Sequence, residues 1–271
     1  MSLKLGLLAS SQQQASPLLL DVYPGATAAF SLRKLRTAYT GFCIRVRRSS
    51  DNTQLDIGFN GSGSVDTTAL LTFVGANNGF VTIWYDQSGS ANNSGTGGFI
   101  TQPQIVFSGS LLIKNSRPYI TASTAQQFVL TSVITRNATD NYSWWYTYEK
   151  DTSGNHPIFS TGAGQYFWLD YGVAQYINNA AQAIVISPVL PINTGILVNN
   201  ICFSSAVTMY TNASSRGSVS PISGSSSWTE ICLNAIRSAK ITMAELVYYP
   251  TNESANRIAI SNNINTYYTI Y

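Results

Sequence analysis

Short runs in which apolar and polar residues alternate occupy most of the chain. Between residues 38 and 48, Tyr39, Phe42, Ile44 and Val46 largely alternate with Thr, Cys and Arg, which is the pattern of a strand that is buried on one face. A turn-forming stretch at residues 49–52 and a second short run at residues 54–59 follow. Together these segments predict a β-hairpin whose arginines lie on the solvent side.

Similar short β-type runs recur to the end of the chain, separated by Gly, Asn, Ser and Pro. They cover residues 80–85, 104–107, 111–113, 127–131, 142–148, 156–160, 166–171, 183–186, 195–203, 207–211, 230–233 and 240–248. Regularly spaced short strands without long helices between them are typical of a β-sandwich or a barrel. The pattern therefore predicts an all-β fold.

Three segments have helical character instead. Residues 26–35 contain good helix formers and predict a short helix, and residues 66–74 predict another with Asp66 as its N-cap. Apolar residues at helical spacing in segment 252–268 predict a C-terminal helix. The Ser- and Gly-rich stretch at residues 214–227 is expected to be an exposed loop.

The chain has no repeat of fixed period and no linker long enough to separate two domains. We expect one domain over residues 17–271, preceded by an arm over residues 1–16. The apolar residues of the arm are Leu3, Leu5, Leu7 and Leu8. Their run is too short for a signal peptide or a membrane span, so we expect the arm to serve in assembly or attachment to a partner.

Composition narrows the class of protein further. Only 10% of the residues are charged, against about 25% in average soluble domains. Such a chain is neither disordered nor a coiled coil, because both need many charges. Six of the fifteen basic residues lie between residues 33 and 48, where we expect a solvated or ion-paired face and no nucleic-acid site.

Cysteine and histidine are scarce. Cys43, Cys202 and Cys232 are far apart, and His156 is the single histidine. No tetrahedral zinc site of the usual kind can be built from this set, and we see no calcium-ligand cluster, so we expect no metal and no cofactor. Buried free thiols are the favoured interpretation and indicate folding in a reducing cytoplasm, although a disulfide between two of the cysteines is possible.

Carboxylates and aromatic residues are the candidates for chemistry. Glycoside hydrolysis needs two carboxyl groups across a pocket, and Glu149, Asp151, Asp170, Glu230 and Glu245 lie at or near predicted strands. Spacing alone does not pair any two of them. The chain also has 16 Tyr, 11 Phe and 5 Trp; such rings can stack on sugars, but in a strand many of them must fill the core.

Two motifs resemble a known family. Residues 29–51 contain Arg-Val-Arg-Arg-Ser-Ser-Asp, and residues 82–92 begin with Thr-Ile-Trp-Tyr-Asp-Gln-Ser-Gly. Both are similar to the opening of the catalytic domain of family-54 α-L-arabinofuranosidases, which implies a concanavalin-A-like β-sandwich (jelly roll). The lead-in at residues 18–24 and the stretch at residues 73–80 resemble tailed-phage virion proteins more closely. Residues 254–268 look like the closing helix of phage lectin-like domains.

The arabinofuranosidase resemblance implies a nucleophilic Glu, an acid/base Asp and a vicinal cysteine pair. This sequence has no adjacent cysteines and no motif onto which either carboxylate aligns. We therefore expect a non-enzymatic virion protein, assembled in the host cytoplasm and displayed on the phage capsid or tail as a decoration or fibre-like protein. A glycoside hydrolase of the α-L-arabinofuranosidase type and a stand-alone lectin are the alternatives.

The expected partners are other virion proteins, further copies of the chain in a homotrimer, and a host-surface glycan; neither a membrane nor a nucleic acid is expected. The candidate glycan contacts are Trp84, Tyr85, Asp86, Gln87, Asn92, Trp145 and Trp168. For Asp86 we favour a structural role, because a carboxylate directly after a strand can accept hydrogen bonds from the backbone of its own turn.

Overall fold

The computed structural model describes most of the chain after the arm. The described residues are 17–96, 98, 102–122, 126–137, 139–151, 156–160, 166–169, 173–178, 180–185, 188–203, 206–220, 225–232 and 240–271. Leu3, Leu5, Leu7 and Leu8 lie outside this set. Their expected role in attachment therefore stays a prediction.

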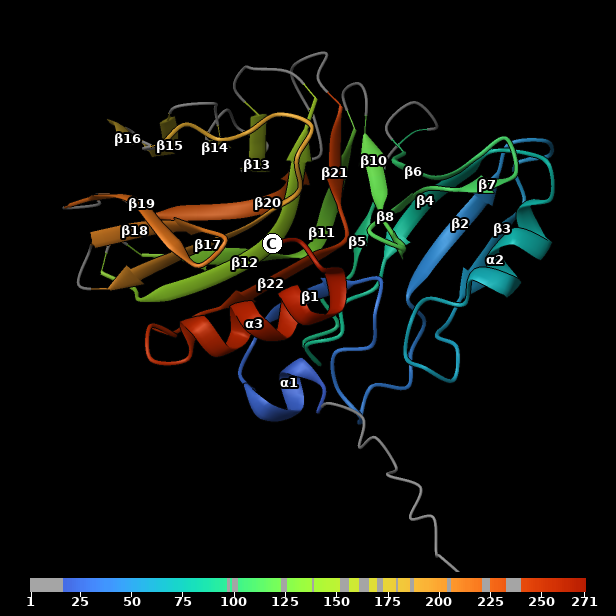
Figure 1. Ribbon diagram of the computed structural model, residues 1–271, viewed down its shortest axis with the longest axis horizontal. Helices are drawn as coiled ribbons and strands as arrows, with labels where there is room; N and C mark the ends of the chain where they lie inside the picture. Colours follow the sequence, from blue (N-terminus) through green and yellow to red (C-terminus); the bar gives the residue numbers. More distant parts are fainter. Residues whose placement is uncertain are drawn as a thin grey trace, which may run out of the picture.

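One layer of antiparallel strands contains both the first and the last strand of the chain (Figure 1). Its order is β1 (Ala28–Ser31), β22 (Glu245–Tyr249), β12 (Tyr142–Lys150), β17 (Ile196–Phe203), β18 (Ala206–Thr211) and β19 (Ser214–Val219). The pairing of β1 with β22 joins Phe30 to Leu246. Two segments more than two hundred residues apart in the chain are thus paired at one edge of this layer.

The other layer is built around the predicted hairpin. Its order is β3 (Gln54–Ile57), β2 (Ile44–Arg48), β4 (Gly79–Trp84), β5 (Ser94–Gly95), β11 (Gln127–Arg136), β20 (Ser226–Cys232), β13 (His156–Ser160), β14 (Tyr166–Leu169), β15 (Val173–Asn178) and β16 (Ala180–Val185). From β4 a branch continues through β6 (Gln104–Phe107) to β7 (Ser110–Leu111), and through β10 (Ile120–Ala122) to β21 (Ile241–Met243).

Strand β12 belongs to both layers. Its first half pairs with β22, whereas Glu149 and Lys150 at its end pair with β21. A separate small hairpin of β8 (Ile113–Lys114) and β9 (Arg117–Pro118) lies near this end. The predicted β-sandwich is therefore confirmed, with a junction between its layers at the end of β12.

Helices complete the fold at two places. Helices α1 (Leu19–Val22) and α3 (Arg257–Tyr268) lie side by side below β1 and β22 (Figure 1). Helix α2 (Thr67–Val74) packs beside β2 and β3, and Asp66 caps it by accepting a hydrogen bond from the N–H of Ala69 (3.0 Å). The predicted helix at residues 66–74 and the predicted C-terminal helix are confirmed.

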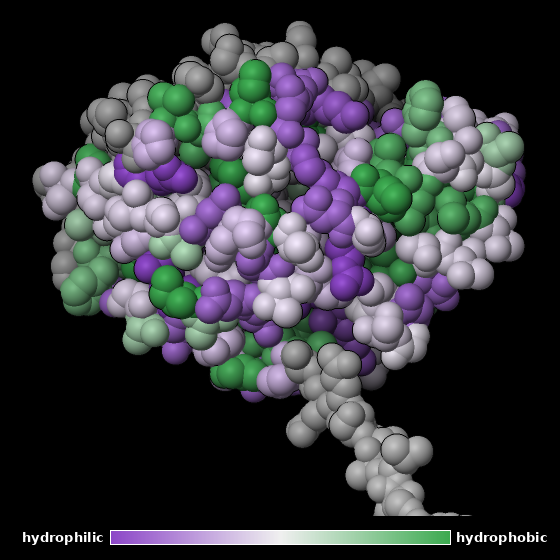
Figure 2. Space-filling view, in the orientation of Figure 1, coloured by the Kyte–Doolittle hydropathy of each residue, from purple (hydrophilic) through white to green (hydrophobic). Residues whose placement is uncertain are grey.

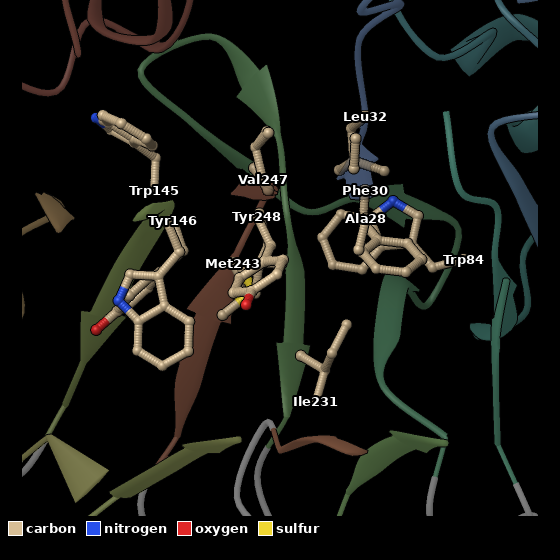
Figure 3. Close-up of a cluster of buried hydrophobic side chains, with 14 of the residues drawn as sticks. Ala28, Phe30, Leu32, Trp84, Trp145, Tyr146, Ile231, Met243, Val247 and Tyr248 are labelled. Atoms are coloured by element: carbon tan, nitrogen blue, oxygen red, sulfur yellow. The ribbon is translucent and has the colours of Figure 1, made fainter. Parts of the chain in front are cut away.

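Aromatic side chains fill much of the space between the layers. Trp84 lies between Phe30 and Phe128, with ring centroids 5.8 Å apart in each pair. Trp145 and Tyr146 leave β12 on opposite sides (Figure 3). Trp145 donates a hydrogen bond from Nε1 to Oγ of Ser261 on α3 (3.0 Å), so β12 is buried on both faces by the core and by the helix.

Two predictions of local structure are wrong. Residues 26–35 do not form a helix: Ala28–Ser31 are the fully buried strand β1, because pairing with β22 overrides the helix propensity of alanine and leucine. The predicted loop at residues 214–227 begins instead with strand β19. Asn212 and Ala213, both in the left-handed region (φ 48° and 65°), form the tight turn that folds β19 onto β18.

The surface is mixed in character. Figure 2 shows hydrophobic side chains gathered over the α2 and β7 end of the molecule and interspersed polar side chains elsewhere. Among the clustered basic residues, Arg33, Arg45 and Arg48 form ion pairs with Glu245, Asp56 and Asp51 respectively. The ion-paired interpretation of this face is confirmed for Arg45 and Arg48. Arg33 is paired in the interior instead. Arg47, expected on the solvent side, is only 6% exposed, because it donates to Gln102 and Asn52. Within the described residues, no helix is long and apolar enough to cross a membrane.

Candidate functional site

Asp86 fastens the turn after β4 to the first strand. Its carboxylate accepts hydrogen bonds from the N–H groups of Ala29 (2.8 Å), Ser88 (2.9 Å) and Asn92 (3.0 Å), and from Oγ of Ser88 (2.7 Å). The residue is only 2% exposed. These contacts agree with the structural role that we favour for Asp86.

Most of the other candidate glycan contacts also lie in the interior. Trp84, Gln87, Asn92 and Trp145 are all buried. Gln87 accepts a hydrogen bond from the N–H of Leu35 (2.8 Å) and donates to the carbonyls of Ser31 and Arg33 (both 3.0 Å). A glycan on the surface cannot reach these groups in this conformation.

Two candidates remain outside that interior group. Tyr85 is partly exposed on the outer face of β4. The backbone of Trp168 belongs to β14, but its side chain lies outside the described part of the chain. The structure therefore brings Trp84, Asp86, Gln87 and Asn92 together as a folding motif, and of the candidates in this segment Tyr85 is the one that is partly exposed.

Glu245 forms the most deeply buried ion pair among the described residues. It accepts two hydrogen bonds from Arg33, at Nε (2.8 Å) and NH2 (2.9 Å), and one from Oγ of Ser31 (2.7 Å). Burial lowers the pKa of Arg33, but the Glu245 carboxylate more than offsets this and leaves the pKa raised. Because β22 and β1 are held together by this pair, we assign Glu245 a structural role.

A small cavity that opens to the surface lies where the end of β12 meets β21. Its volume is about 50 Å³, and its wall includes Lys114, Tyr119, Glu149, Gly195 and Thr242. A methyl group on Gly195 would lie 3.7 Å from Oε2 of Glu149 and 3.8 Å from Cε of Lys114, so a larger side chain there would fill the cavity. This space admits about one or two water-sized groups.

Glu149 is the polar centre of this cavity. Its Oε2 is ion-paired with the Nζ of Lys114, and its side chain is 17% exposed. Burial, with the negative charge of Glu149, raises the pKa of Tyr119, so the phenol stays protonated at neutral pH and can donate a hydrogen bond. The cavity thus combines an acceptor carboxylate, a cation and a phenol donor.

A second carboxylate follows just after the end of β12. Asp151 continues the ladder, since its N–H donates to the carbonyl of Lys240 (3.2 Å) and its Oδ1 accepts from the N–H of Lys240 (2.9 Å). Asp151 is exposed, and its carboxylate is turned to the backbone of Lys240. Glycoside hydrolysis uses two carboxyl groups, and Glu149 and Asp151 are the two that this end of the strand supplies.

The sequence could point to these two carboxylates but not to their surroundings. Glu149 and Asp151 are close in the chain, whereas Lys114, Tyr119 and Gly195 come from distant segments and carry no local signal. Of the other carboxylates considered from the sequence, Glu230 accepts one hydrogen bond from Nε2 of Gln127 (3.1 Å), and Asp170 lies outside the described residues. The Glu149 cavity is therefore our candidate site.

The remaining groups of interest are structural in the part of the chain that is described. Cys43 and Cys202 are free and buried, as expected, and burial raises the pKa of the Cys43 thiol well above its usual range. The side chain of Cys232 is outside the described set. Within that set, no group of three or more His, Cys, Asp and Glu side chains could hold a metal ion.

The candidate site of this β-sandwich thus has one carboxylate in a small cavity and a second two residues further along the chain. The family model for the catalytic domain of α-L-arabinofuranosidase B matches residues 21–167, which is more than half of the chain. The chain therefore belongs to this family. The matched segment includes Glu149 and Asp151.

Solved structures agree with this fold. The chain is 17% identical to a GH54 α-L-arabinofuranosidase soaked with a cyclic sulfate inhibitor, with a TM-score of 0.63. It is 16% identical to an arabinofuranosidase complexed with arabinofuranosyl-α-1,2-xylobiose, with a TM-score of 0.61. In both comparisons 91% of this chain is covered, and it spans 64% of the length of the other chain. No curated protein sequence matches significantly.

These findings correct the expected function. The expectation of a non-enzymatic phage virion protein is wrong, because the family model that matches is that of an arabinofuranosidase catalytic domain. The alternative of an arabinofuranosidase-type hydrolase is the one that the comparisons favour.

Proposed function

We propose that the chain is a glycoside hydrolase domain that releases α-L-arabinofuranosyl groups, with Glu149 and Asp151 as its pair of carboxyl groups. The observation that carries this proposal is the family match over residues 21–167. Further support comes from the position of both carboxylates inside the matched segment, at and just after the end of β12.

In glycoside hydrolysis the two carboxyl groups have different roles. One carboxyl group protonates the oxygen of the leaving group, while the other attacks the sugar directly or activates a water molecule. The cavity beside Glu149 is too small for a furanose ring. In the proposed complex the ring lies at the mouth, between Glu149 and the exposed Asp151, and only a hydroxyl group enters the cavity next to Lys114 and Tyr119.

The test is the release of 4-nitrophenol from 4-nitrophenyl α-L-arabinofuranoside. The unmodified chain is expected to hydrolyse it, and Glu149→Gln and Asp151→Asn are each expected to lower kcat by about a hundredfold or more. Asp21→Asn is the matched control, because this exposed carboxylate only accepts hydrogen bonds from Thr37. Its rate should equal that of the unmodified chain.

Two further variants test the placement of the site separately from the proposed activity. Glu230→Gln and Asp170→Asn should retain activity. If they abolish it while Glu149→Gln remains active, the chain is a hydrolase whose site we have placed wrongly. If the unmodified, folded chain releases no 4-nitrophenol at all, the proposed function itself is refuted.

A further inference from the structure

A second hollow lies over strands β2, β3, β4 and β5. It consists of two open depressions of about 750 and 510 Å³, and Gln54 lines both of them. We call these two depressions together the outer groove. It shares no lining residue with the Glu149 cavity.

The floor of the outer groove is a row of cross-strand neighbours. Asp56 pairs with Arg45, Arg45 with Ile83, and Ile83 with Gly95. Three strand spacings make this row about 14 Å long. Gly95 contributes no side chain at the far end of the row, so the described residues form an extended track that suits a chain-like ligand.

An exposed aromatic platform stands at one end of the track. Phe42 is 48% exposed, and its ring centroid lies 6.2 Å from that of Tyr85 at an angle of 48°. The hydroxyl of Tyr85 donates to Oδ1 of Asp56 (2.6 Å), which fixes the ring. The backbone of Phe42 is held as well, since its carbonyl accepts a hydrogen bond from the hydroxyl of Tyr39 (2.8 Å).

The charges in the outer groove cancel. Arg45 donates to Asp56 through Nε and NH2 (both 2.8 Å), and this paired geometry is among the strongest that side chains form. Hydrogen bonding from Arg45 lowers the pKa of Asp56, so the pair stays ionised and neutral as a unit. The other polar residues that line the groove are uncharged: Asn52, Gln54, Thr82, Thr96 and Gln102.

The class of ligand follows from this lining, which combines aromatic rings, neutral hydrogen-bonding groups and no net charge. Arg47 donates to Gln102 and Asn52 of this lining, but it is itself buried. A nucleic acid or an acidic polymer would need exposed, uncompensated cations, and the described residues that line the groove provide none. Hydroxyl groups, in contrast, can bond to amide and hydroxyl side chains, and the apolar face of a sugar ring can pack on Phe42. We propose that the outer groove binds a neutral polysaccharide chain, at a site separate from the Glu149 cavity and independent of hydrolysis.

Affinity gel electrophoresis of the full chain tests this proposal. The probe is soluble linear xylan, which carries no arabinosyl group that the domain could remove, and the comparison polymers are polygalacturonate and DNA. Xylan is expected to retard the unmodified chain, and the two anionic polymers are not. Phe42→Ala should weaken binding about tenfold or more, as loss of a central aromatic contact does.

Phe203→Ala is the matched control, because Phe203 is 55% exposed but lies at the end of β17 in the other layer. It should bind as the unmodified chain does. Gln54→Ala is a second groove variant, expected to bind more weakly, and melting curves verify that each variant is folded. Absence of retardation by xylan, equal effects of Phe42→Ala and Phe203→Ala, or stronger retardation by an anionic polymer would overturn the proposal.

The same preparations are assayed on 4-nitrophenyl α-L-arabinofuranoside. We expect Phe42→Ala to leave this rate unchanged. A chain that binds xylan but does not hydrolyse the arabinoside contradicts only the proposed function. A chain that hydrolyses the arabinoside but is not retarded by xylan contradicts only the proposed groove.

Discussion

Replacing Asp86 by alanine should destabilise the fold more than any single change of a surface carboxylate. The side chain connects the turn after β4 to β1 through three backbone N–H groups and one hydroxyl. The N–H groups of Ala29 and Asn92 are buried, so water cannot replace the lost acceptor there. Ser88 is only partly buried and can turn to solvent.

The magnitude follows from these two buried donors. Each buried donor left without an acceptor costs about 1–3 kcal/mol, so Asp86→Ala should lower the free energy of unfolding by about 2–6 kcal/mol. Asp86→Asn retains one carbonyl oxygen and loses the second acceptor. We expect it to cost about half as much, on the order of 1–3 kcal/mol.

Urea denaturation followed by tryptophan fluorescence measures both values, because Trp84 is buried beside this turn. Asp21→Ala is the control, and since Asp21 is exposed it should cost about 1 kcal/mol or less. If Asp86→Ala unfolds within about 0.5 kcal/mol of the unmodified chain, a range typical of neutral surface changes, the structural role of Asp86 is refuted.

Two other predictions concern titratable groups. In a Cys232→Ser variant a thiol reagent should label neither Cys43 nor Cys202 until urea is added, because both are buried; rapid labelling of the native protein would contradict this burial. The Arg45 partner lowers the folded-state pKa of Asp56, so this pair stabilises the fold above the unfolded pKa of about 3.9 and the stabilisation is lost as the pH falls below it. The free energy of unfolding, measured by urea denaturation, should therefore fall less between about pH 5 and pH 2 for Asp56→Asn than for the unmodified chain. Parallel plots of this free energy against pH for the two proteins would contradict the assignment.

Local signals were sufficient for part of the fold. The β2–β3 hairpin has clear alternation and a turn between its strands, and Asp66 is a cap that acts within four residues. Strand β1 has no such signal, because its state is set by pairing with β22 at the other end of the chain. For the same reason β19 was missed: its turn at Asn212 and Ala213 lacks the Asn-Gly dipeptide that marks such hairpins.

Only part of the candidate site around Glu149 could be predicted from the sequence. Glu149 and Asp151 stand out as neighbouring carboxylates near a strand end, but the cavity depends on Lys114, Tyr119 and Gly195, which only the folded chain brings together. For the aromatic residues, prominence in the sequence did not indicate a place at the surface. Trp84 and Trp145 are conspicuous in the sequence, yet they are packing residues. Phe42 is expected from the alternation on the buried side of its strand, but it is 48% exposed.

The pairing of β1 with β22 has a consequence for how the protein is made. A ribosome releases residues 28–31 long before residues 245–249 exist, so the buried strand β1 has no partner during almost the whole of synthesis. Such non-local pairing slows folding and leaves an apolar strand open to aggregation in the meantime. The N-terminal half should therefore remain incompletely folded on the ribosome, and nascent chains that stop before Glu245 should depend on chaperones to stay in solution.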